Sequence, residues 1–268
     1  MGGIVGLIMT TWNDCDAFSA AYDSLFRSMP SLATNGGVPY GWGFCVVDGG
    51  SGPEELECIK DFCSRRTLAL FGEAPDLTDA LNVGIKYFTG GSDGYPLSIK
   101  LPYIGWVHPD MLFPDLGWVP KLVKYLDDHP DVGKVSPIVR RFDEVPEDLR
   151  KEGGEPFKAW LAQQMREDTE RPGNQCPWIM PLRALKAVEM GKDMWFDPGY
   201  KGVANYDDWD LNRRLIDAGF KVMITPETIV IHEGMGTRKT KTHEDNAPLE
   251  RHNAQYYFDK FGDSRCPV

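Results

Sequence analysis

The sequence predicts an α/β protein, in which a mostly parallel central sheet is flanked by helices within a single domain. Short apolar runs typical of buried strands alternate with helical segments through the first half of the chain, as in strand–helix–strand units. The 268 residues, of which 42% are hydrophobic, suffice for the core of one large α/β domain. No internal repeat and no linker divides the sequence. We therefore expect one domain over residues 1–268.

Local patterns place the elements of the first half. Apolar runs bounded by turn residues predict strands over 4–9, 42–47, 67–72, 103–107 and 133–139. The segments between them predict helices over 16–29, 53–65, 76–88 and 116–130. Asp16 is a candidate N-cap of the first helix. Pro53, which is followed by acidic residues, suits the first turn of the second helix.

The second half of the chain has a less regular pattern. Residues 141–175 are polar and charged, and they predict a short helix over 156–167 or a mobile insertion. Further helices are expected over 180–191, with Gly191 as a C-cap glycine, and after the YDDWD segment. Residues 221–234 predict a strand pair or one extended segment. The polar residues 237–248 predict a flexible segment, and the last helix is expected over 249–261.

Charge and cysteine usage restrict the partners and the compartment. The formal net charge is −11 and basic clusters are short, which argues against duplex binding but leaves a nucleotide or a nucleic-acid acceptor open. No apolar run of about 18 residues predicts a membrane span, and the N-terminus does not resemble a signal peptide. The six cysteines lack a CxxC pair and are expected to be mostly free thiols, which favours a reducing cytoplasm. Peripheral membrane association stays open.

Side chains with chemical potential follow the predicted strands. In an open parallel sheet, ligands bind beyond the carboxyl ends of the strands. The segments TTWND, DGGSG and HPDM stand at three such ends. Asp48 closes the second strand and could accept hydrogen bonds from a nucleobase or a ribose. The alternative is a plain Asp-Gly turn.

The segment WVHPDM suggests a metal site. His108 and Asp110 are two residues apart, so on an extended segment both point to one side. A carboxylate and an imidazole together can hold a divalent cation, most naturally Mn²⁺. A turn with a local histidine hydrogen bond is the alternative. His232 follows a separate apolar run directly, which is a typical place for a ligand, although a lone histidine is usually structural.

The YDDWD segment places Asp207, Asp208 and Asp210 ahead of a helix. Acidic residues in a first turn are favoured by the helix dipole alone. Three within four residues exceed what capping requires, and one of them could act as a general base. The aromatic residues beside them, Tyr206 and Trp209, fit either a sugar-stacking platform or the core.

These motifs, taken in order, resemble the family 2 glycosyltransferases of the GT-A fold, a Rossmann-like α/β fold, over roughly residues 4–236. The motifs are the Thr-x-Asn of TTWND, VVDGGS, ALNVG, HPD, DDWDLNRRLIDAGF and IHEGMGT. The resemblance implies that nucleotide binding involves Thr11, Asn13, Asp48, Asn82 and His108. It also implies that Asp110 and His232 coordinate Mn²⁺ or Mg²⁺. His108 departs from the family, because an acid usually stands at its position.

The resemblance further implies a mechanism and a division of the chain. Asp208 would be the general base, with Asp207 as its substitute and Asp210 structural. The expected reaction is metal-dependent transfer, with inversion, from a nucleotide-diphosphate sugar, most naturally a UDP-sugar, to a hydroxyl of a glycan or other acceptor. A catalytically impaired nucleotide-sugar-binding module is the alternative. The nucleotide-sugar half would span 1–135 and the acceptor and catalytic half 136–236. A flexible segment, a candidate lid, and the last helix would occupy 237–268.

Overall fold

One continuous sheet runs through the computed structural model of the chain, which describes residues 5–29, 42–66, 68–72, 74, 76–90, 101–152, 154–202, 206–234 and 243–268. The strands are β1 Val5–Thr11, β2 Trp42–Asp48, β3 Ala69–Phe71, β4 Tyr103–Val107, β5 Met111–Leu112, β6 Val132–Arg141, β7 Arg171–Pro172, β8 Trp178–Pro181 and β9 Lys221–His232. The helices are α1 Cys15–Ser28, α2 Pro53–Arg66, α3 Leu77–Thr89, α4 Trp118–Asp128, α5 Glu147–Glu152, α6 Gly154–Glu167, α7 Leu182–Ala187, α8 Asp207–Asp217 and α9 His243–Phe261, with a 3-10 turn η1 at Phe142–Glu144.

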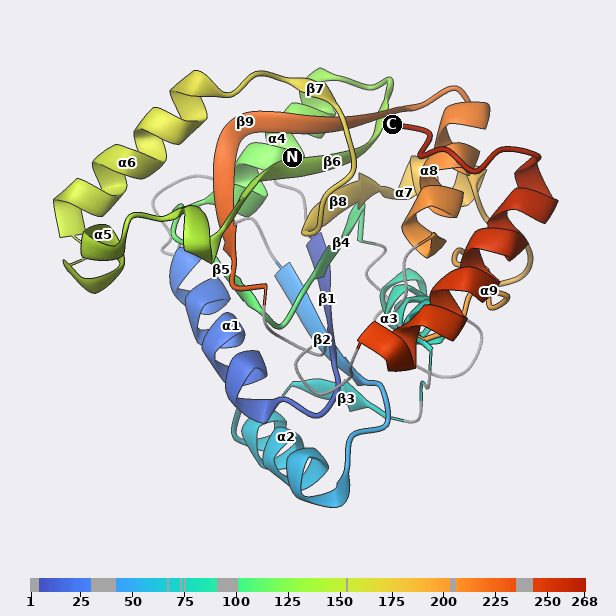
Figure 1. Cartoon of the computed structure of the whole chain (residues 1–268), viewed down its shortest axis with the longest axis horizontal. Helices are drawn as coiled ribbons and strands as arrows, with labels where there is room; N and C mark the ends of the chain where they lie inside the picture. The colour runs from blue at the N-terminus through green and yellow to red at the C-terminus, as the bar shows by residue number, and fades with distance from the viewer. Residues whose placement is uncertain are drawn as a thin grey trace.

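The strand order within the described residues is β3-β2-β1-β4-β8-β6-β9-β5, and β7 pairs with β9 outside this path (Figure 1). Strands β1 to β4 are mutually parallel, and β6 is parallel to β9. The short strand β8 runs antiparallel between β4 and β6 and joins the two parallel groups. The expected α/β class with a mostly parallel sheet is thus confirmed, whereas β8 is a strand that the sequence analysis missed.

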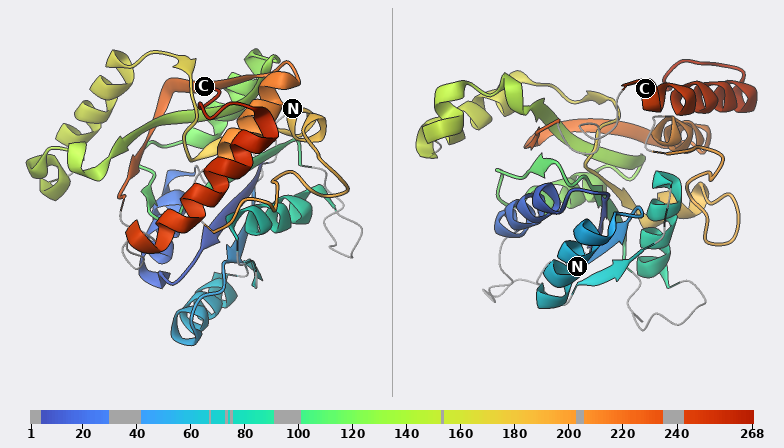
Figure 2. Two further views of the ribbon diagram at one scale, coloured as in Figure 1. Left: turned by 45° about the vertical axis from the view of Figure 1, so that its right-hand side comes forward. Right: turned by 60° about the horizontal axis from the view of Figure 1, so that its bottom comes forward.

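Helices cover both faces of the sheet, as the alternation of side chains in β1 requires (Figure 2). Leu7 and Met9 pack into a core shared with α1 and α4. Ile8 points to the opposite face and packs with α3, α7 and α8. A β-carbon at Gly84 of α3 would lie 2.5 Å from Ile8 Cγ2, so the glycine lets this helix approach the sheet closely.

The region 141–175 is folded onto the sheet rather than being a loose insertion. The expected helix over 156–167 is confirmed as α6, and α5 precedes it. Leu161 of α6 and Val145 pack in a third apolar cluster with Ile138 of β6 and Ile229 of β9. This subregion, with α5 and α6, forms the left side of the molecule in Figure 1.

Several expected boundaries were wrong. The N-cap of α1 is Asp14, whose Oδ1 accepts a hydrogen bond from Ala17 N at 2.9 Å, and not Asp16. Helix α7 ends at Ala187, and Gly191 instead pairs with Met194 in an isolated bridge. Of the two alternatives for residues 221–234, the single extended segment is confirmed, because Lys221–His232 form one strand, β9.

The expected flexible segment 237–248 divides in two. Residues from His243 onward already belong to α9, which therefore begins earlier than the expected helix over 249–261. Residues 237–242, with most of the candidate lid, lie outside the described residues.

The cysteine expectation was wrong for one pair. Cys15 and Cys58 form a disulfide with a Cα–Cα distance of 6.2 Å, which joins α1 to α2. The other four cysteines are free thiols, namely Cys45, Cys63, Cys176 and Cys266. Cysteine usage therefore gives no support to the expected reducing compartment. In the described parts of the chain, no helix is both long and apolar enough to cross a membrane.

Candidate active site

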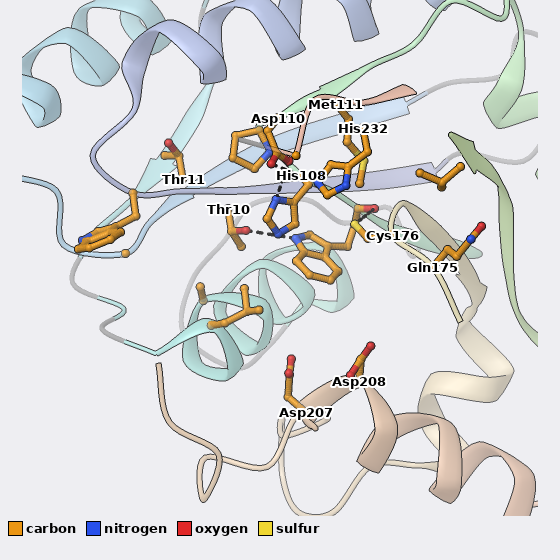
Figure 3. A pocket seen from close by; sticks show the side chains of 18 of the residues that line it. Thr10, Thr11, His108, Asp110, Met111, Gln175, Cys176, Asp207, Asp208 and His232 are labelled. Carbon is orange, nitrogen blue, oxygen red and sulfur yellow. Dashed lines mark hydrogen bonds and ion pairs between the residues drawn. The ribbon is translucent and has the colours of Figure 1, made fainter. Parts of the chain in front are cut away.

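A cavity of about 760 Å³ opens at the carboxyl ends of the parallel strands. Thr11 at the end of β1, Gly49 after β2 and His108 after β4 line one part of it. The first turn of α8 and the end of β9 line another part (Figure 3). The cavity therefore lies at the edge of the sheet where the sequence places its candidate residues.

Two histidines and an aspartate form a compact cluster in this cavity. His108 Nδ1 lies 3.0 Å from Asp110 Oδ1, and His232 Nε2 lies 3.1 Å from Asp110 Oδ2. One ligand atom from each residue lies within 4.8 Å of the others, as a single bound cation requires. Asp110 is 6% exposed, and the two imidazoles are partly exposed towards the cavity.

Strand pairing brings the cluster together across 122 positions of sequence. Strand β5 turns back after the HPD segment and pairs antiparallel with β9, which sets Met111 opposite His232. The Glu233 amide also donates a hydrogen bond to the Asp110 carbonyl at 2.9 Å. Asp110 and His232 are thus fixed by backbone pairing rather than by side-chain contacts alone.

The electrostatics of the cluster favour an ionised carboxylate. Burial by itself raises the pKa of Asp110, but hydrogen bonds and charge interactions with His108 and His232 outweigh it and hold the pKa well below its ordinary value. A buried carboxylate kept ionised between two imidazoles is a suitable donor set for a divalent transition metal.

Two further carboxylates face this cluster from α8. Asp207 and Asp208 both line the cavity, on the side opposite Asp110 in Figure 3. Asp208 is partly exposed, and its Oδ1 accepts a hydrogen bond from Trp209 N at 2.9 Å. Asp207 is 7% exposed, and burial together with the neighbouring Asp208 charge raises its pKa to about 7.

Asp210, the third acid of the segment, is part of the core. Its carboxylate is fully buried and pairs with Arg214 and Lys260, both at 2.5 Å. Tyr200 adds a hydrogen bond from its hydroxyl at 3.2 Å. These contacts fix α8 against α9 and agree with the structural role expected for Asp210.

Among the expected nucleotide-binding residues, Thr11 and His108 reach the cavity. The Thr11 hydroxyl is buried and has no hydrogen-bond partner among the described residues, which leaves it available to a ligand. Asp48 is 1% exposed, and its carboxylate accepts hydrogen bonds from the amides of Gly50 and Ser51 at 3.0 and 2.9 Å. In this structure Asp48 thus holds an Asp-Gly turn.

Asn13 and Asn82, which were also expected to bind the nucleotide, form side-chain hydrogen bonds within the protein. Asn13 Oδ1 accepts a hydrogen bond from Gly52 N at 2.6 Å and joins the loops after β1 and β2. Asn82 Oδ1 accepts from the amides of Trp195 and Phe196 at 2.9 Å each, and its Nδ2 donates to the Phe196 carbonyl at 2.7 Å. Both residues support the cavity walls, and neither lines the cavity.

The cavity has aromatic walls that the sequence analysis did not identify. Trp12 and Trp106 line it, whereas Trp178 and Trp195 are buried in the core. Trp12 lies within the TTWND motif, so its position at a strand end was the signal that could have identified it. Tyr206 and Trp209 pack on each other and on Tyr257 of α9.

Comparison with known families gives one match to this chain. The family model described as glycosyl transferase family 2 matches residues 7–185. That range includes most of β1, the HPD segment and β8, and it ends before α8. A comparison with curated protein sequences finds no match.

Solved structures share the fold at low identity. A mannosyltransferase from Pyrobaculum calidifontis in complex with GDP-Man and Mn²⁺ has a TM-score of 0.58 at 15% identity, over 98% of this chain and 65% of that chain. S. aureus TarS 1-349 in complex with UDP has a TM-score of 0.55 at 14% identity, over 95% and 65%. Glucosyl-3-phosphoglycerate synthase from Mycobacterium tuberculosis, in complex with Mn²⁺, UDP-glucose and phosphoglyceric acid, has a TM-score of 0.55 at 13% identity, over 97% and 80%. The chain thus spans about two thirds of the first two proteins.

Proposed function

This chain belongs to glycosyl transferase family 2, and we propose that it transfers a sugar from a nucleotide-diphosphate sugar to an acceptor hydroxyl, with inversion and with a divalent cation. The observation that carries the proposal is the arrangement of one cavity. A cluster with the ligand geometry for one cation, His108–Asp110–His232, lies on one wall, and the carboxylates Asp207 and Asp208 lie on the other. This arrangement separates the site for the leaving diphosphate from the site of proton removal.

The residues present fit a divalent cation. The cluster offers one carboxylate and two imidazoles, and such mixed nitrogen and oxygen donors suit Mn²⁺ better than Mg²⁺, which prefers oxygen alone. Asp110 would be the central ligand, with His232 and His108 beside it. The bound cation would neutralise the negative charge of the diphosphate leaving group.

The remaining chemistry belongs to the chain itself. Asp208 is our candidate general base, because its carboxylate is partly exposed to the cavity while Asp207 is nearly buried. Asp208 would accept the proton of the acceptor hydroxyl as that oxygen attacks the anomeric carbon. Attack from the face opposite the leaving group inverts the configuration in a single displacement.

The donor is proposed to be a UDP-sugar. The solved structures of similar fold contain GDP-Man in one case and UDP or UDP-glucose in the others. Thr11 and Trp12 at the end of β1 would contact the nucleotide, because they line the cavity and the Thr11 hydroxyl has no partner among the described residues. The acceptor is proposed to be a glycan or another molecule with a free hydroxyl.

Isothermal titration of UDP, GDP and dTDP, each with and without Mn²⁺, tests the binding part of this proposal. We expect one nucleotide to bind tightly only with Mn²⁺, and Asp110→Ala to abolish that binding. Asp115→Ala is the matched control. Asp115 lies five positions later and its carboxylate bonds to Lys121 at 2.7 Å.

The outcomes separate the proposal from its alternative. A nucleotide that binds with Mn²⁺ to wild type and to Asp115→Ala, but not to Asp110→Ala, supports the cation site. Sugar transfer that is lost in Asp208→Asn while nucleotide binding persists supports the assigned base. Nucleotide binding without any sugar transfer or donor hydrolysis would instead indicate a catalytically impaired module.

A further inference from the structure

A lysine with a fully buried side chain lies behind the cavity wall that carries Asp207 and Asp208. Lys134 is in β6 and is 0% exposed. Its Nζ donates hydrogen bonds to Asn174 Oδ1 at 2.5 Å and to Asn212 Oδ1 at 3.0 Å, and it lies 5.4 Å from the centre of the Trp178 ring. Lysine is almost never fully buried unless it is paired, so this position requires an explanation.

The hydrogen bonds of Lys134 lead directly to the candidate base. Asn174 accepts from Lys134 through its Oδ1 and donates through its Nδ2 to Asp208 Oδ2. The amide of Asn174 is thereby polarised in one direction, from the ammonium group to the carboxylate. Because the other Asp208 oxygen accepts from the Trp209 amide, the whole carboxylate is held in one orientation.

The titratable groups that surround Lys134 are acids. The titratable groups that act on it are Asp207 and Asp208 of α8, Cys176 before β8 and Cys266 near the C-terminus. Burial lowers the pKa of Lys134 to about 8, while the Asp208 charge opposes this shift. Lys134 and the Asp207–Asp208 pair are therefore each other's countercharges, and the Asn174 amide joins the lysine to Asp208.

Resting on the transferase function proposed above, we propose that Lys134 and Asn174 are positioning residues that supply the countercharge of the Asp207–Asp208 pair and hold the Asp208 carboxylate oriented towards the acceptor. Neither residue is among those that line the cavity. Their effect is electrostatic and geometric. The ammonium group stabilises the negative form of the pair, and the amide fixes its direction.

A purely structural role makes a different prediction. Lys134 also bonds to Asn212 of α8, so it could simply join β6 to that helix. In that case its removal would lower the stability of the protein without changing where the Asp207–Asp208 pair titrates. The titration of the pair is consequently the decisive measurement.

The first experiment is a carbon-13 NMR titration of the aspartate carboxyl groups in wild type, Lys134→Met and Asn174→Ala, with signals assigned through Asp207→Asn and Asp208→Asn. We expect the titration of the pair to move up by about one pH unit or more in Lys134→Met. Asn174→Ala keeps the lysine and tests the link itself, so the series remains informative if Lys134→Met fails to fold. Unchanged midpoints in the folded variants would overturn the proposal.

The second experiment follows the pH profile of sugar transfer in the same proteins. We expect kcat at neutral pH to fall about tenfold in Lys134→Met, with the acidic limb shifted to higher pH and the donor KM unchanged. Lys260→Met is the control, since Lys260 bonds to the structural acid Asp210 of the same helix at 2.5 Å. The control should lose stability and keep the position of its acidic limb.

The two experiments distinguish this proposal from the function on which it rests. If wild type transfers no sugar, the proposed function fails, and the NMR titration still decides whether Lys134 sets the ionisation of the pair. If wild type is active but Lys134→Met and Asn174→Ala keep its pH profile, the positioning role fails while the transferase function stands.

Discussion

Asp207 is a buried acid whose ionisation opposes folding. Burial and the Asp208 charge raise its pKa to about 7 from the ordinary 3.8, so the folded protein favours the protonated carboxyl. Its contribution to stability is therefore fully present below about pH 4 and is lost as the pH rises towards 7. We expect Asp207→Asn to stabilise the protein by roughly 2 kcal/mol at pH 8 and to have little effect at pH 4. Urea denaturation at both values measures the difference.

Asp217→Asn is the control for this prediction. Asp217 ends the same helix, and its carboxylate bonds to Arg213 at the surface. A stability change of similar size at both pH values in Asp207→Asn would indicate that Asp207 is already ionised in the fold, which contradicts the prediction.

His108 allows a test of metal preference. An acid usually stands at this position in the family that the sequence resembles, whereas here His108 Nδ1 lies 3.0 Å from Asp110 Oδ1. Replacing an imidazole ligand by a carboxylate favours Mg²⁺, because Mg²⁺ prefers oxygen donors. We expect His108→Asp to raise Mg²⁺ affinity relative to Mn²⁺ by about tenfold, as calorimetric titration of both ions would show. An unchanged ratio would mean that His108 does not contact the cation.

The residue types predicted which side chains gather at the cavity better than they predicted what each side chain contacts. Asp110, His232 and the pair of acids on α8 follow strand ends or open a helix, and the fold brings them to one cavity. Asp48 and Asn82 occupy equally suggestive positions, yet their oxygens bond to backbone amides. A sequence shows which groups a side chain carries, but not whether the nearby backbone already satisfies them.

At the scale of elements, helix α3 depends on one glycine. A β-carbon at Gly84 would lie 2.5 Å from Ile8 Cγ2, and Ile8 is fully buried in the central strand β1. We expect Gly84→Ala to destabilise the protein by about 1–3 kcal/mol, because the close-packed core does not absorb the extra methyl group. Chemical denaturation measures the loss.

Gly72→Ala serves as the matched control for that substitution. Gly72 follows β3, and a β-carbon there would meet no atom within 4 Å. Its substitution should be neutral or slightly stabilising, because it restricts only the unfolded chain. Equal effects at the two positions would show that α3 shifts easily away from the sheet.

The strand β8 shows why some elements escaped the sequence analysis. Its residues Trp178–Pro181 follow Pro177 and end in a proline, and the helix expected over 180–191 overlaps the last two of them. Its antiparallel pairing with β4 and β6 comes from distant parts of the chain. Long runs such as β6 and α4 were predictable because their local pattern agrees with their environment, whereas β8 depends on tertiary pairing.

For the whole molecule, the Cys15–Cys58 disulfide joins the first two helices over a sequence separation of 43 residues. Closing a loop of this length restricts the unfolded chain and stabilises the fold by roughly 2–4 kcal/mol. We expect a reducing agent to lower the urea midpoint of the wild type to that of the Cys15→Ser, Cys58→Ser double variant. The double variant should not respond to the reductant.

The same bond has a consequence for the site. Cys15 begins α1 two residues after Asn13, which joins the loops after β1 and β2 through its hydrogen bond to Gly52. The Cys15 amide also donates to Glu55 of α2 at 2.8 Å, so hydrogen bonds hold these loops together independently of the disulfide. Reduction should therefore lower global stability while changing nucleotide affinity less than about threefold. A nucleotide affinity that collapses on reduction would instead show that the covalent bond itself maintains the wall of the cavity.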